Sequence, residues 1–322
     1  MPSSRRSPHA RTEDAIADSL RIVSYNVHCC VGRSGLAEPA RIADVLREMR
    51  ADVACLQEVD SGYVLRQGDQ LAALAELTGL RPVSGATLSS DDGEYGNALL
   101  SRFPLRRVRS AFYEGAGERR GALSAEIDWE GELLGVTVTH FGLSARDRAA
   151  QAQALVKLTG ERPDGLDVIA GDFNEWQPFS AALLHLDARL GPGVAPRTFP
   201  ARCPLLRLDR IWVTPRERVL RSGVLDTPAA RRASDHLPVW VDVEPRSGRR
   251  PPTQRRHGKA ERRRHDRLHA PRDREDPVHL PPEPVRASAS LRDPSQFAPG
   301  SPQTRAGGAR QGRLCGEGSR SS

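Results

Sequence analysis

The sequence predicts an α/β protein in which two mixed β-sheets pack face to face and helices cover the outside. Two observations lead to this prediction. In both halves of the 322-residue chain, segments with a helical spacing of apolar residues fall between strand-like segments. The middle of the chain, residues 97–139, instead carries consecutive strand patterns that are separated by turns. Two sheets packed on each other would bury both kinds of segment.

The first half of the chain supplies two predicted strands and two predicted helices. Residues 21–27 alternate and are rich in β-branched side chains, which predicts a strand. Residues 38–49 have helical spacing, with Pro39 suited to the first turn. Residues 52–56 predict a short buried strand that ends at Gln57-Glu58, and residues 70–77 a helix closed by Gly79.

The rest of the body is predicted to contain mostly strands. These are residues 97–101, 105–112, 122–129, 133–139, 166–170, 208–213, 219–225 and 237–243, with Gly131 as a hairpin signal. A helix is expected at 144–158, where Ser144 and Asp147 fit a capping box, and another near 179–186.

Charge divides the chain unevenly. Residues 245–322 hold 18 Lys and Arg against 8 Asp and Glu, whereas residues 1–244 hold 30 against 33. The net charge of +7 therefore comes from the tail. We expect a disordered N-terminus at 1–19, a folded domain at 20–244 and a disordered basic tail rich in Pro and Arg at 245–322. The tail either binds polyanions without specificity, or is solvated with no dedicated partner, or is a translational artefact of a GC-rich gene.

Cysteine usage and hydropathy bear on the compartment. The five cysteines show no CxxC spacing, and an odd number argues against a disulfide framework. The first 20 residues lack the apolar core of a secretory signal, and no apolar run approaches the length of a membrane span. We expect a cytoplasmic, monomeric protein without a transmembrane segment.

Polar side chains follow several predicted strands. Asn26, Glu58, His140, Asp172 and Asp235 all stand where such a strand ends. Carboxylate and amide oxygens at strand ends suit a hard divalent cation, and such a cation activates water against a phosphate ester. Each residue alone has an ordinary alternative, as a surface side chain or a turn residue.

The runs 171–174 and 234–238 carry the most chemistry. Asp172 and Asn174 are two residues apart and share a side in an extended segment, so Asp172 could orient or deprotonate water while Asn174 stabilises phosphoryl charge. Asp235 offers a carboxylate to a metal. His236 offers an imidazole to the phosphate or the water, and a buried Asp209 would need such a partner.

Six short motifs in this order resemble the endonuclease/exonuclease/phosphatase superfamily, the group of deoxyribonuclease I, apurinic endonucleases, inositol polyphosphate 5-phosphatases and bacterial sphingomyelinases. The motifs are Ser24-Tyr25-Asn26, Leu56-Gln57-Glu58, Thr139-His140-Phe141, Gly171-Asp172-Phe173-Asn174, Leu208-Asp209-Arg210 and Ser234-Asp235-His236-Leu237-Pro238. The resemblance covers about residues 20–244. It implies a deoxyribonuclease I-like four-layer α/β/β/α sandwich and hydrolysis that depends on Mg²⁺ or Mn²⁺, by in-line attack of water.

The resemblance also implies roles for the site residues. Glu58 is a metal ligand with Asn26 and Asp235 near it, and Asp172 and Asn174 position water and phosphate. His236, supported by Asp209, is a base or an electrostatic catalyst, and His140 contacts the phosphate. The general base is either Asp172 or His236.

The motifs of this sequence do not assign it to one branch of the superfamily. His28 stands where apurinic endonucleases usually carry Asp. The runs 95–101 and 119–123 resemble small bacterial members, some of which are similar to the lipid-anchor remodelling branch. Arg119, Arg120 and Asn97 are candidates for contacts with a substrate phosphate, and solvated turn arginines are the alternative.

The main functional hypothesis is a phosphodiesterase, with nucleic acid and phospholipid head groups as competing substrates. The slightly acidic body and an aromatic content of 5% weaken the nucleic-acid hypothesis. A lipid would require exposed apolar loops, for which residues 191–204 are a candidate. A phosphomonoesterase acting on a small metabolite and a catalytically inactive binding module are the alternatives.

Overall fold

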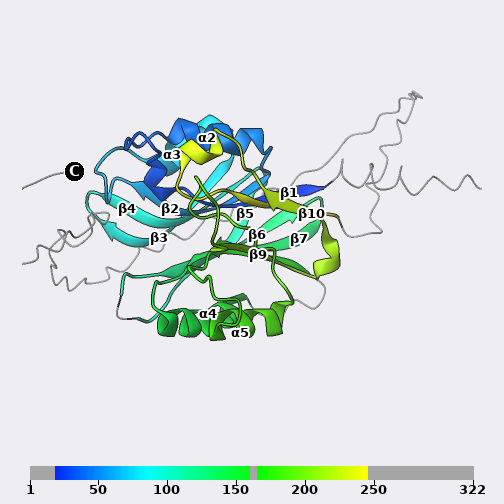
Figure 1. Cartoon of the computed structure of the whole chain (residues 1–322). Helices are drawn as coiled ribbons and strands as arrows, with labels where there is room; N and C mark the ends of the chain where they lie inside the picture. Colours follow the sequence, from blue (N-terminus) through cyan, green and yellow to red (C-terminus); the bar gives the residue numbers. More distant parts are fainter. Residues whose placement is uncertain (1–18, 116, 160–164, 246–322) are drawn as a thin grey trace, which may run out of the picture. The chain divides into compact units, whose positions relative to one another are not determined.

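Two β-sheets form the centre of the structure, a computed structural model that describes residues 19–115, 117–159 and 165–245 (Figure 1). The first sheet has the order β10-β11-β1-β2-β4-β3. Its strands are β1 (Leu20–Asn26), β2 (Val53–Ser61), β3 (Arg81–Ser90), β4 (Gly93–Ser101), β10 (Val219–Val224) and β11 (Val239–Val243). The second sheet has the order β5-β6-β7-β8-β9. Its strands are β5 (Leu105–Phe112), β6 (Gly121–Trp129), β7 (Glu132–His140), β8 (Leu166–Asp172) and β9 (Asp209–Thr214).

Both sheets are mixed. Strands β1 and β2 are parallel, as are β7 and β8, and the other pairs in the sheets are antiparallel. The inner faces pack through one apolar cluster that includes Ile22, Val53 and Val241 from the first sheet and Val136 and Val168 from the second. Burying these faces against each other is the main apolar contribution to the fold.

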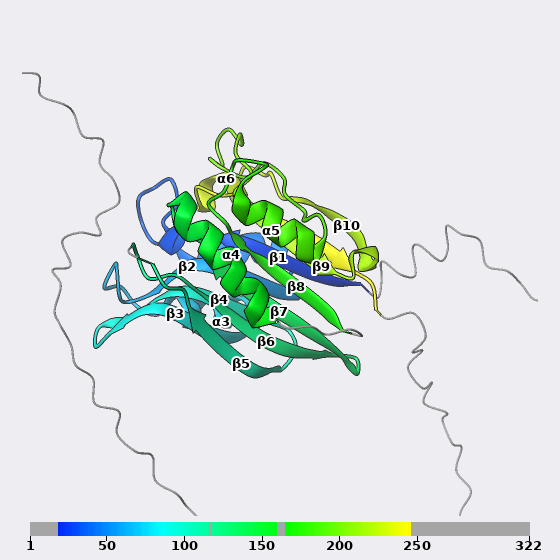
Figure 2. The same cartoon turned by 90° about the horizontal axis from the view of Figure 1, so that it is seen from below.

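Helices cover the two outer faces. In Figure 1, α2 (Pro39–Glu48) and α3 (Gln70–Thr78) lie above the first sheet, and α4 (Ala145–Thr159) and α5 (Ala181–Leu190) lie below the second. Figure 2 shows α4 and α5 side by side across the second sheet. The predicted four-layer α/β/β/α sandwich is confirmed. The short elements are η1 (His28–Cys30), η2 (Arg216–Arg218) and α6 (Ala230–Ala233).

Local sequence explains how the helices begin and end. Pro39 opens α2, whose buried Ile42 and Leu46 are four residues apart and face the sheet. Asp69 caps α3 by accepting a hydrogen bond from the Ala72 N–H, and Gly79 ends it with a φ of 72°. These helices match their predicted positions closely.

Two strands differ from the sequence prediction. Strand β3 was not predicted, because Pro82, Gly85 and its serines have low β-propensity, but it pairs along the edge of β4. Strand β2 was expected to end at Gln57-Glu58, but it continues to Ser61. A β-bulge at this point, with Glu58 at a φ of 57°, allows pairing with β4 to resume at Val59.

Some predictions concern residues that the structure does not describe. The expected disordered N-terminus and basic tail lie outside the described residues except for Ser19 and Pro245, so the boundaries at 19/20 and 244/245 stay predictions. Within the described part of the chain, no helix is long and apolar enough to cross a membrane.

Candidate active site

Five strands bring polar side chains to one edge of the sandwich. The carboxyl ends of the parallel pairs β1–β2 and β7–β8 lie at this edge, and β9 begins there because it runs antiparallel to β8. Asp172 on β8 is the direct register partner of His140 on β7 and of Asp209 on β9. Residues far apart in sequence therefore meet at a single site.

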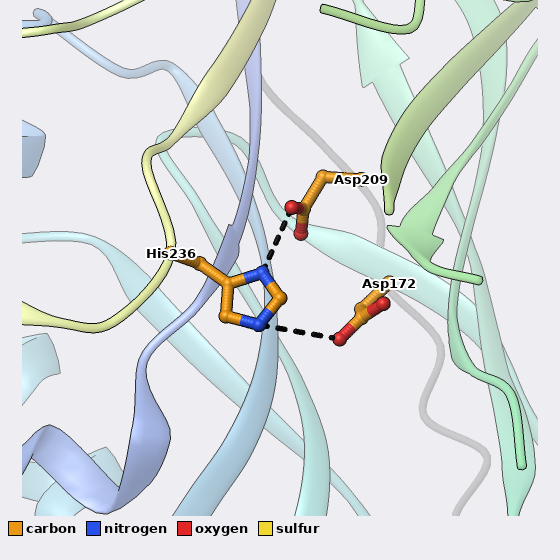
Figure 3. Close-up of side chains that lie close together, drawn as sticks. All are labelled: Asp172, Asp209 and His236. Carbon is orange, nitrogen blue, oxygen red and sulfur yellow. Dashed lines mark hydrogen bonds and ion pairs between the residues drawn. The ribbon is translucent and has the colours of Figure 1, made fainter. Parts of the chain in front are cut away.

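His236 joins two aspartates from the second sheet. Its Nδ1 lies 2.9 Å from Asp209 Oδ2, and its Nε2 lies 3.7 Å from Asp172 Oδ2 (Figure 3). Asp209 Oδ2 also accepts a hydrogen bond from the Thr198 hydroxyl. All three side chains in Figure 3 are at least 94% buried. The imidazole is therefore fixed by Asp209 on one side and presents its second nitrogen toward Asp172.

The two carboxylates of this cluster stabilise the protonated form of His236. Burial opposes protonation of His236, but the carboxylates of Asp209 and Asp172 outweigh that effect and raise the pKa of His236 to about 10. Burial raises the pKa of Asp209, and the His236 imidazole acts in the opposite direction. We assign the pair as carboxylate and imidazolium, because Asp209 Oδ2 accepts hydrogen bonds from both Thr198 and His236.

Asn26 connects two further carboxylates. Its Nδ2 donates to Glu58 Oε1 at 2.9 Å and to Asp172 Oδ2 at 3.0 Å, while its Oδ1 accepts the backbone N–H of His28. Asn26 therefore orients Glu58 and Asp172. Ligation of a cation by its oxygen, which retains a second lone pair, stays a prediction.

Glu58 and Asp235 form an acidic pair beside this group. The His28 imidazole lies between them, with its Nδ1 3.5 Å from Glu58 Oε2 and 3.8 Å from Asp235 Oδ2. Burial opposes ionisation of Glu58, but His28, His140 and Asn26 outweigh it and lower the pKa of Glu58 well below its usual range. Both carboxylates lie near the His28 ring, and their role as ligands of a hard divalent cation stays a prediction.

A second set of possible ligands overlaps with the first. One ligand atom each from Asp172, Asp209 and His236 lies within 4.8 Å of the others. His236 Nδ1 and Asp209 Oδ2 already bond each other, and a protonated His236 has no lone pair for a metal. Asp172, Asp209 and His236 form a possible metal site, and a cation held by Glu58 and Asp235 stays a prediction.

His140 stands on the opposite side of the site. Its Nε2 lies 3.5 Å from Asp172 Oδ2, and Arg120 Nη1 lies 2.6 Å from its Nδ1. Burial and then the charge of Arg120 lower the pKa of His140 to about 4, so this imidazole is neutral at pH 7. The Asn174 amide is held beside it by donating to the Phe141 carbonyl at 2.9 Å.

The three candidate contacts to a substrate phosphate separate in the structure. Arg120 reaches the site through His140, but Arg119 is exposed and its guanidinium stacks 3.8 Å from the Phe112 ring centroid. Asn97 is buried and donates to the Gly121 carbonyl. Of the three, the structure brings only Arg120 into contact with the other site residues.

A buried ion pair connects the loops that follow β7 and β8. Arg148 on α4 donates through Nε to Glu175 Oε2 at 3.0 Å and through Nη1 to the Leu143 carbonyl at 2.6 Å. Its guanidinium also lies over the Trp176 ring. This pair and Thr198 were not predicted from the sequence. No local sequence pattern indicates these contacts, because Arg148 and Glu175 are 27 residues apart and Thr198 and Asp209 are 11 residues apart.

A hollow of about 600 Å³ opens beside the site. Arg120 and Glu118 line it on one side, and Leu143, Asp147 and Gln151 on the other. Arg120 lines this hollow and also contacts His140, so the hollow adjoins the candidate phosphate-binding side of the site.

Comparisons with known proteins agree with this arrangement. The model of the Endonuclease/Exonuclease/phosphatase family matches residues 23–236. The Escherichia coli (strain K12) protein YbhP is 30% identical over 253 residues, covering 70% of this chain and 96% of YbhP. An endonuclease/exonuclease/phosphatase structure from Beutenbergia cavernae superposes with a TM-score of 0.55 at 25% identity, covering 70% of this chain and 71% of that one.

A more distant structure shares the fold. Mannosyl-6-phosphatase Bt3783 of Bacteroides thetaiotaomicron superposes with a TM-score of 0.56 at 19% identity, covering 69% of this chain and 98% of that one. The family match spans the strands, the bulge at Glu58 and the loops that carry the buried aspartate–histidine cluster. This chain therefore belongs to the endonuclease/exonuclease/phosphatase family of phosphoesterases.

Proposed function

We propose that this protein hydrolyses a phosphodiester by in-line attack of water and requires a divalent cation, Mg²⁺ or Mn²⁺. The observation that carries this proposal is the 3.7 Å gap between Asp172 Oδ2 and His236 Nε2. A single water would lie within hydrogen-bonding reach of both atoms. The acidic pair Glu58 and Asp235 lies on the far side of Asn26, which itself bonds Asp172.

One group of side chains acts on the attacking water, and another acts on the phosphate. Asp172 and His236 orient the attacking water. Because His236 is already protonated, Asp172 is the one of the two that accepts the proton of the water. His140 and Asn174 donate hydrogen bonds to the phosphoryl oxygens, whose charge grows as the water attacks. A cation bound at Glu58 and Asp235 would neutralise charge on the phosphate and lower the pKa of water.

A phospholipid-type head group is the substrate class that the surface favours. Leu143, Trp176 and Phe179 on the loops after β7 and β8 are 77%, 53% and 82% exposed, and we call them the apolar rim. In the loop 191–204, where apolar exposure was expected, Val194 and Ala201 are buried instead. Exposed apolar side chains next to a phosphoesterase site suit a lipid interface better than a nucleic acid.

A second candidate is a phosphomonoesterase that acts on a small, hydroxyl-rich metabolite. The hollow beside Arg120 favours it, because Glu114, Glu118 and Asp147 line the walls with hydrogen-bond acceptors. The distant structural neighbour named mannosyl-6-phosphatase acts, by its name, on a substrate of this kind.

The test compares substrates in parallel on the full chain with Mg²⁺ or Mn²⁺. Phospholipid vesicles, plasmid DNA, abasic duplex, RNA and mannose 6-phosphate would each be assayed with the wild type and with Glu58→Gln. We expect metal-dependent release of a phosphorylated head group from vesicles that Glu58→Gln abolishes. Cleavage of DNA or RNA alone would overturn the lipid assignment, and hydrolysis of mannose 6-phosphate alone would support the second candidate. Full activity in Glu58→Gln would overturn the catalytic site itself.

A further inference from the structure

Arginines gather on neighbouring segments beside the site. We call this set the basic face, and it consists of Arg33, Arg41, Arg202, Arg231 and Arg232. Hydrogen bonds join the segments that carry it. The Arg33 N–H donates to the Arg232 carbonyl at 3.1 Å, and Arg231 Nη1 donates to the Arg202 carbonyl at 2.9 Å. The loop after η1, the loop before β9 and helix α6 therefore form one continuous surface.

Most of the positive charge on this surface is not neutralised. Arg41 pairs with Glu38 at 2.6 Å, and Arg231 pairs with Asp226. In the part of the chain that the structure describes, no carboxylate forms an ion pair with the other three, which are exposed, namely Arg33, Arg202 and Arg232. Residues 1–244 hold 30 basic against 33 acidic side chains, so this excess of positive charge is local. Such an excess fits an anionic partner.

The basic face borders the site residues. Arg232 lies three residues before Asp235, whose carbonyl accepts the N–H of Ala201 beside Arg202. Arg33 follows η1, the turn that begins with His28. The basic face and the apolar rim therefore lie at the same edge of the sandwich, where the carboxyl ends of the parallel strands open.

Two exposed leucines lie on the same segments. Leu36 and Leu205 are 64% and 61% exposed. Ser34 Oγ accepts hydrogen bonds from the Leu36 N–H at 3.3 Å and from Arg41 Nη1 at 2.8 Å, so the turn that presents Leu36 is held in place. A nucleic acid would be bound by the arginines and would leave the leucines without a function. Cationic and apolar side chains together fit the surface of an anionic membrane.

We propose that the basic face docks this protein on an anionic phospholipid bilayer. The unpaired arginines meet lipid phosphates, and Leu36 and Leu205 enter the boundary between head groups and acyl chains. The edge that carries the site then faces the bilayer. This inference rests on the proposed function, because a phospholipid substrate lies in such a bilayer, and it specifies the surface charge of the membrane. A nucleic acid is the competing partner.

Cosedimentation of the full chain with vesicles tests the proposal, with a chelator present so that binding is measured without hydrolysis. The vesicles contain either phosphatidylcholine alone or equal parts of phosphatidylcholine and phosphatidylglycerol. The test variant combines Arg33→Gln, Arg202→Gln and Arg232→Gln. A second variant combines Leu36→Ser and Leu205→Ser. Residues 245–322 stay unchanged in every variant, so their basic side chains contribute equally throughout.

The matched control removes the same charge from the opposite edge of the sandwich. It combines Arg50→Gln, Arg81→Gln and Arg106→Gln, all at exposed positions. Arg50 precedes β2, and Arg81 pairs with Ser101 at the far end of β4. Arg106 lies near the start of β5, away from the strand ends that carry the site. Circular dichroism would verify that each variant is folded.

We expect the wild type and the control to bind the mixed vesicles at least about tenfold more tightly than phosphatidylcholine alone, and added salt should reduce this preference. The triple arginine variant should lose at least about tenfold on mixed vesicles, because each basic side chain near an anionic surface contributes a factor of about five. The leucine variant should lose about fivefold or more. Arg202→Gln and Arg232→Gln alone should each lose at least about twofold, which keeps the test valid if the triple variant misfolds.

Two results would overturn the proposal. One is an affinity for mixed vesicles that stays within about twofold of the wild type in both the triple and the single arginine variants. The other is a loss confined to duplex DNA, measured in parallel by fluorescence anisotropy, with vesicle binding unchanged and the leucine variant unaffected. That second result would assign the basic face to nucleic acid.

The outcomes also separate this inference from the proposed function. If the protein binds vesicles through the basic face but hydrolyses none of their lipids, the docking surface stands and the lipid substrate fails. If lipids are hydrolysed with added metal and the triple variant binds mixed vesicles as the wild type does, the proposed function stands and this inference fails.

Discussion

The guanidinium of Arg120 determines which nitrogen of His140 carries the proton. Arg120 Nη1 lies 2.6 Å from His140 Nδ1, and a guanidinium can only donate. Nδ1 must therefore accept, which places the proton of the neutral ring on Nε2. The contact of 3.1 Å between Nε2 and Asn174 Nδ2 is then not a hydrogen bond, since both nitrogens carry hydrogen. His140 thus points one N–H into the site, where it can meet a phosphoryl oxygen.

Arg120→Gln should raise the pKa of His140. The pKa of about 4 results from burial first and from the charge of Arg120 second, so removing the charge should raise the value while burial keeps it below 6.5. Protonation would then begin at a higher pH than in the wild type. Nuclear magnetic resonance of the imidazole in metal-free protein measures this directly. Arg119→Gln, whose guanidinium stacks on Phe112, should leave the titration unchanged, and an equal shift in both variants would contradict the assignment.

Glu58→Gln should abolish most metal-dependent hydrolysis. The substitution keeps the size of the side chain but removes the charge that we propose holds a cation, so we expect a loss of about 100-fold or more in kcat/KM. A chelator should produce a similar loss in the wild type, and added Mn²⁺ should restore it. Glu76→Gln on the exposed side of α3 is the matched control and should retain full activity.

Asp209→Asn should flatten the pH dependence of stability. The folded-state pKa of His236, about 10, lies above its ordinary 6.5, so its stabilisation is complete below pH 6.5 and is lost as the pH rises toward 10. In that window the free energy of unfolding should fall with a slope on the order of 1 kcal/mol per pH unit. Asp209→Asn removes the main cause of the raised pKa and should reduce this slope.

Denaturant unfolding at several pH values, with a chelator present, tests this expectation. Asp44→Asn, on the exposed face of α2, provides the control because its carboxylate is 64% exposed. Identical slopes in Asp209→Asn and the wild type would show that His236 does not depend on Asp209 for its charge.

The apolar rim should matter only for substrates at an interface. The double substitution Leu143→Ser and Phe179→Ser removes two exposed apolar side chains, which should weaken activity on phospholipid vesicles by about tenfold or more. Activity on a short-chain, monomeric phosphodiester should remain within about twofold. Leu184→Ser, at a position on α5 that is 54% exposed, should affect neither assay. A matching loss on both substrates would indicate damage to the site rather than loss of membrane contact.

Helices and strands whose apolar residues recur at regular spacing were predictable from the sequence. Elements that form only because they pair with a neighbouring strand were not. Helix α2 was located correctly because Ile42 and Leu46 lie on one apolar face and Pro39 marks its start. Strand β3 has no such pattern, and only pairing with β4 defines it. The bulge at Glu58 was likewise invisible, because a left-handed residue inside a strand depends on the register of the neighbouring strand.

The same distinction holds in the site. The strand-end positions of Asn26, His140 and Asp172 followed from local patterns. Parallel pairing of β7 and β8 places His140 beside Asp172, and the packing of the two sheets brings Asn26 to Asp172. Sequence could not separate Arg119 from Arg120, because which of two adjacent side chains turns inward depends on the path of the backbone. The same limit applies to Thr198, whose hydroxyl becomes relevant only because its loop folds back onto Asp209.

Arg148 binds the backbone of the loop after β7 rather than its side chains. Substrate specificity can therefore change in this fold while the catalytic residues stay in place. Arg148 donates a hydrogen bond to the backbone carbonyl of Leu143, a group that every amino acid has. It donates a second hydrogen bond to the buried Glu175 in the loop after β8. Mutation can therefore replace the outward-facing side chains of Leu143 and Trp176 while His140 and Asn174 keep their positions. Relatives with the same reaction centre can acquire new substrates by exchanging a few surface residues, and engineers can do the same.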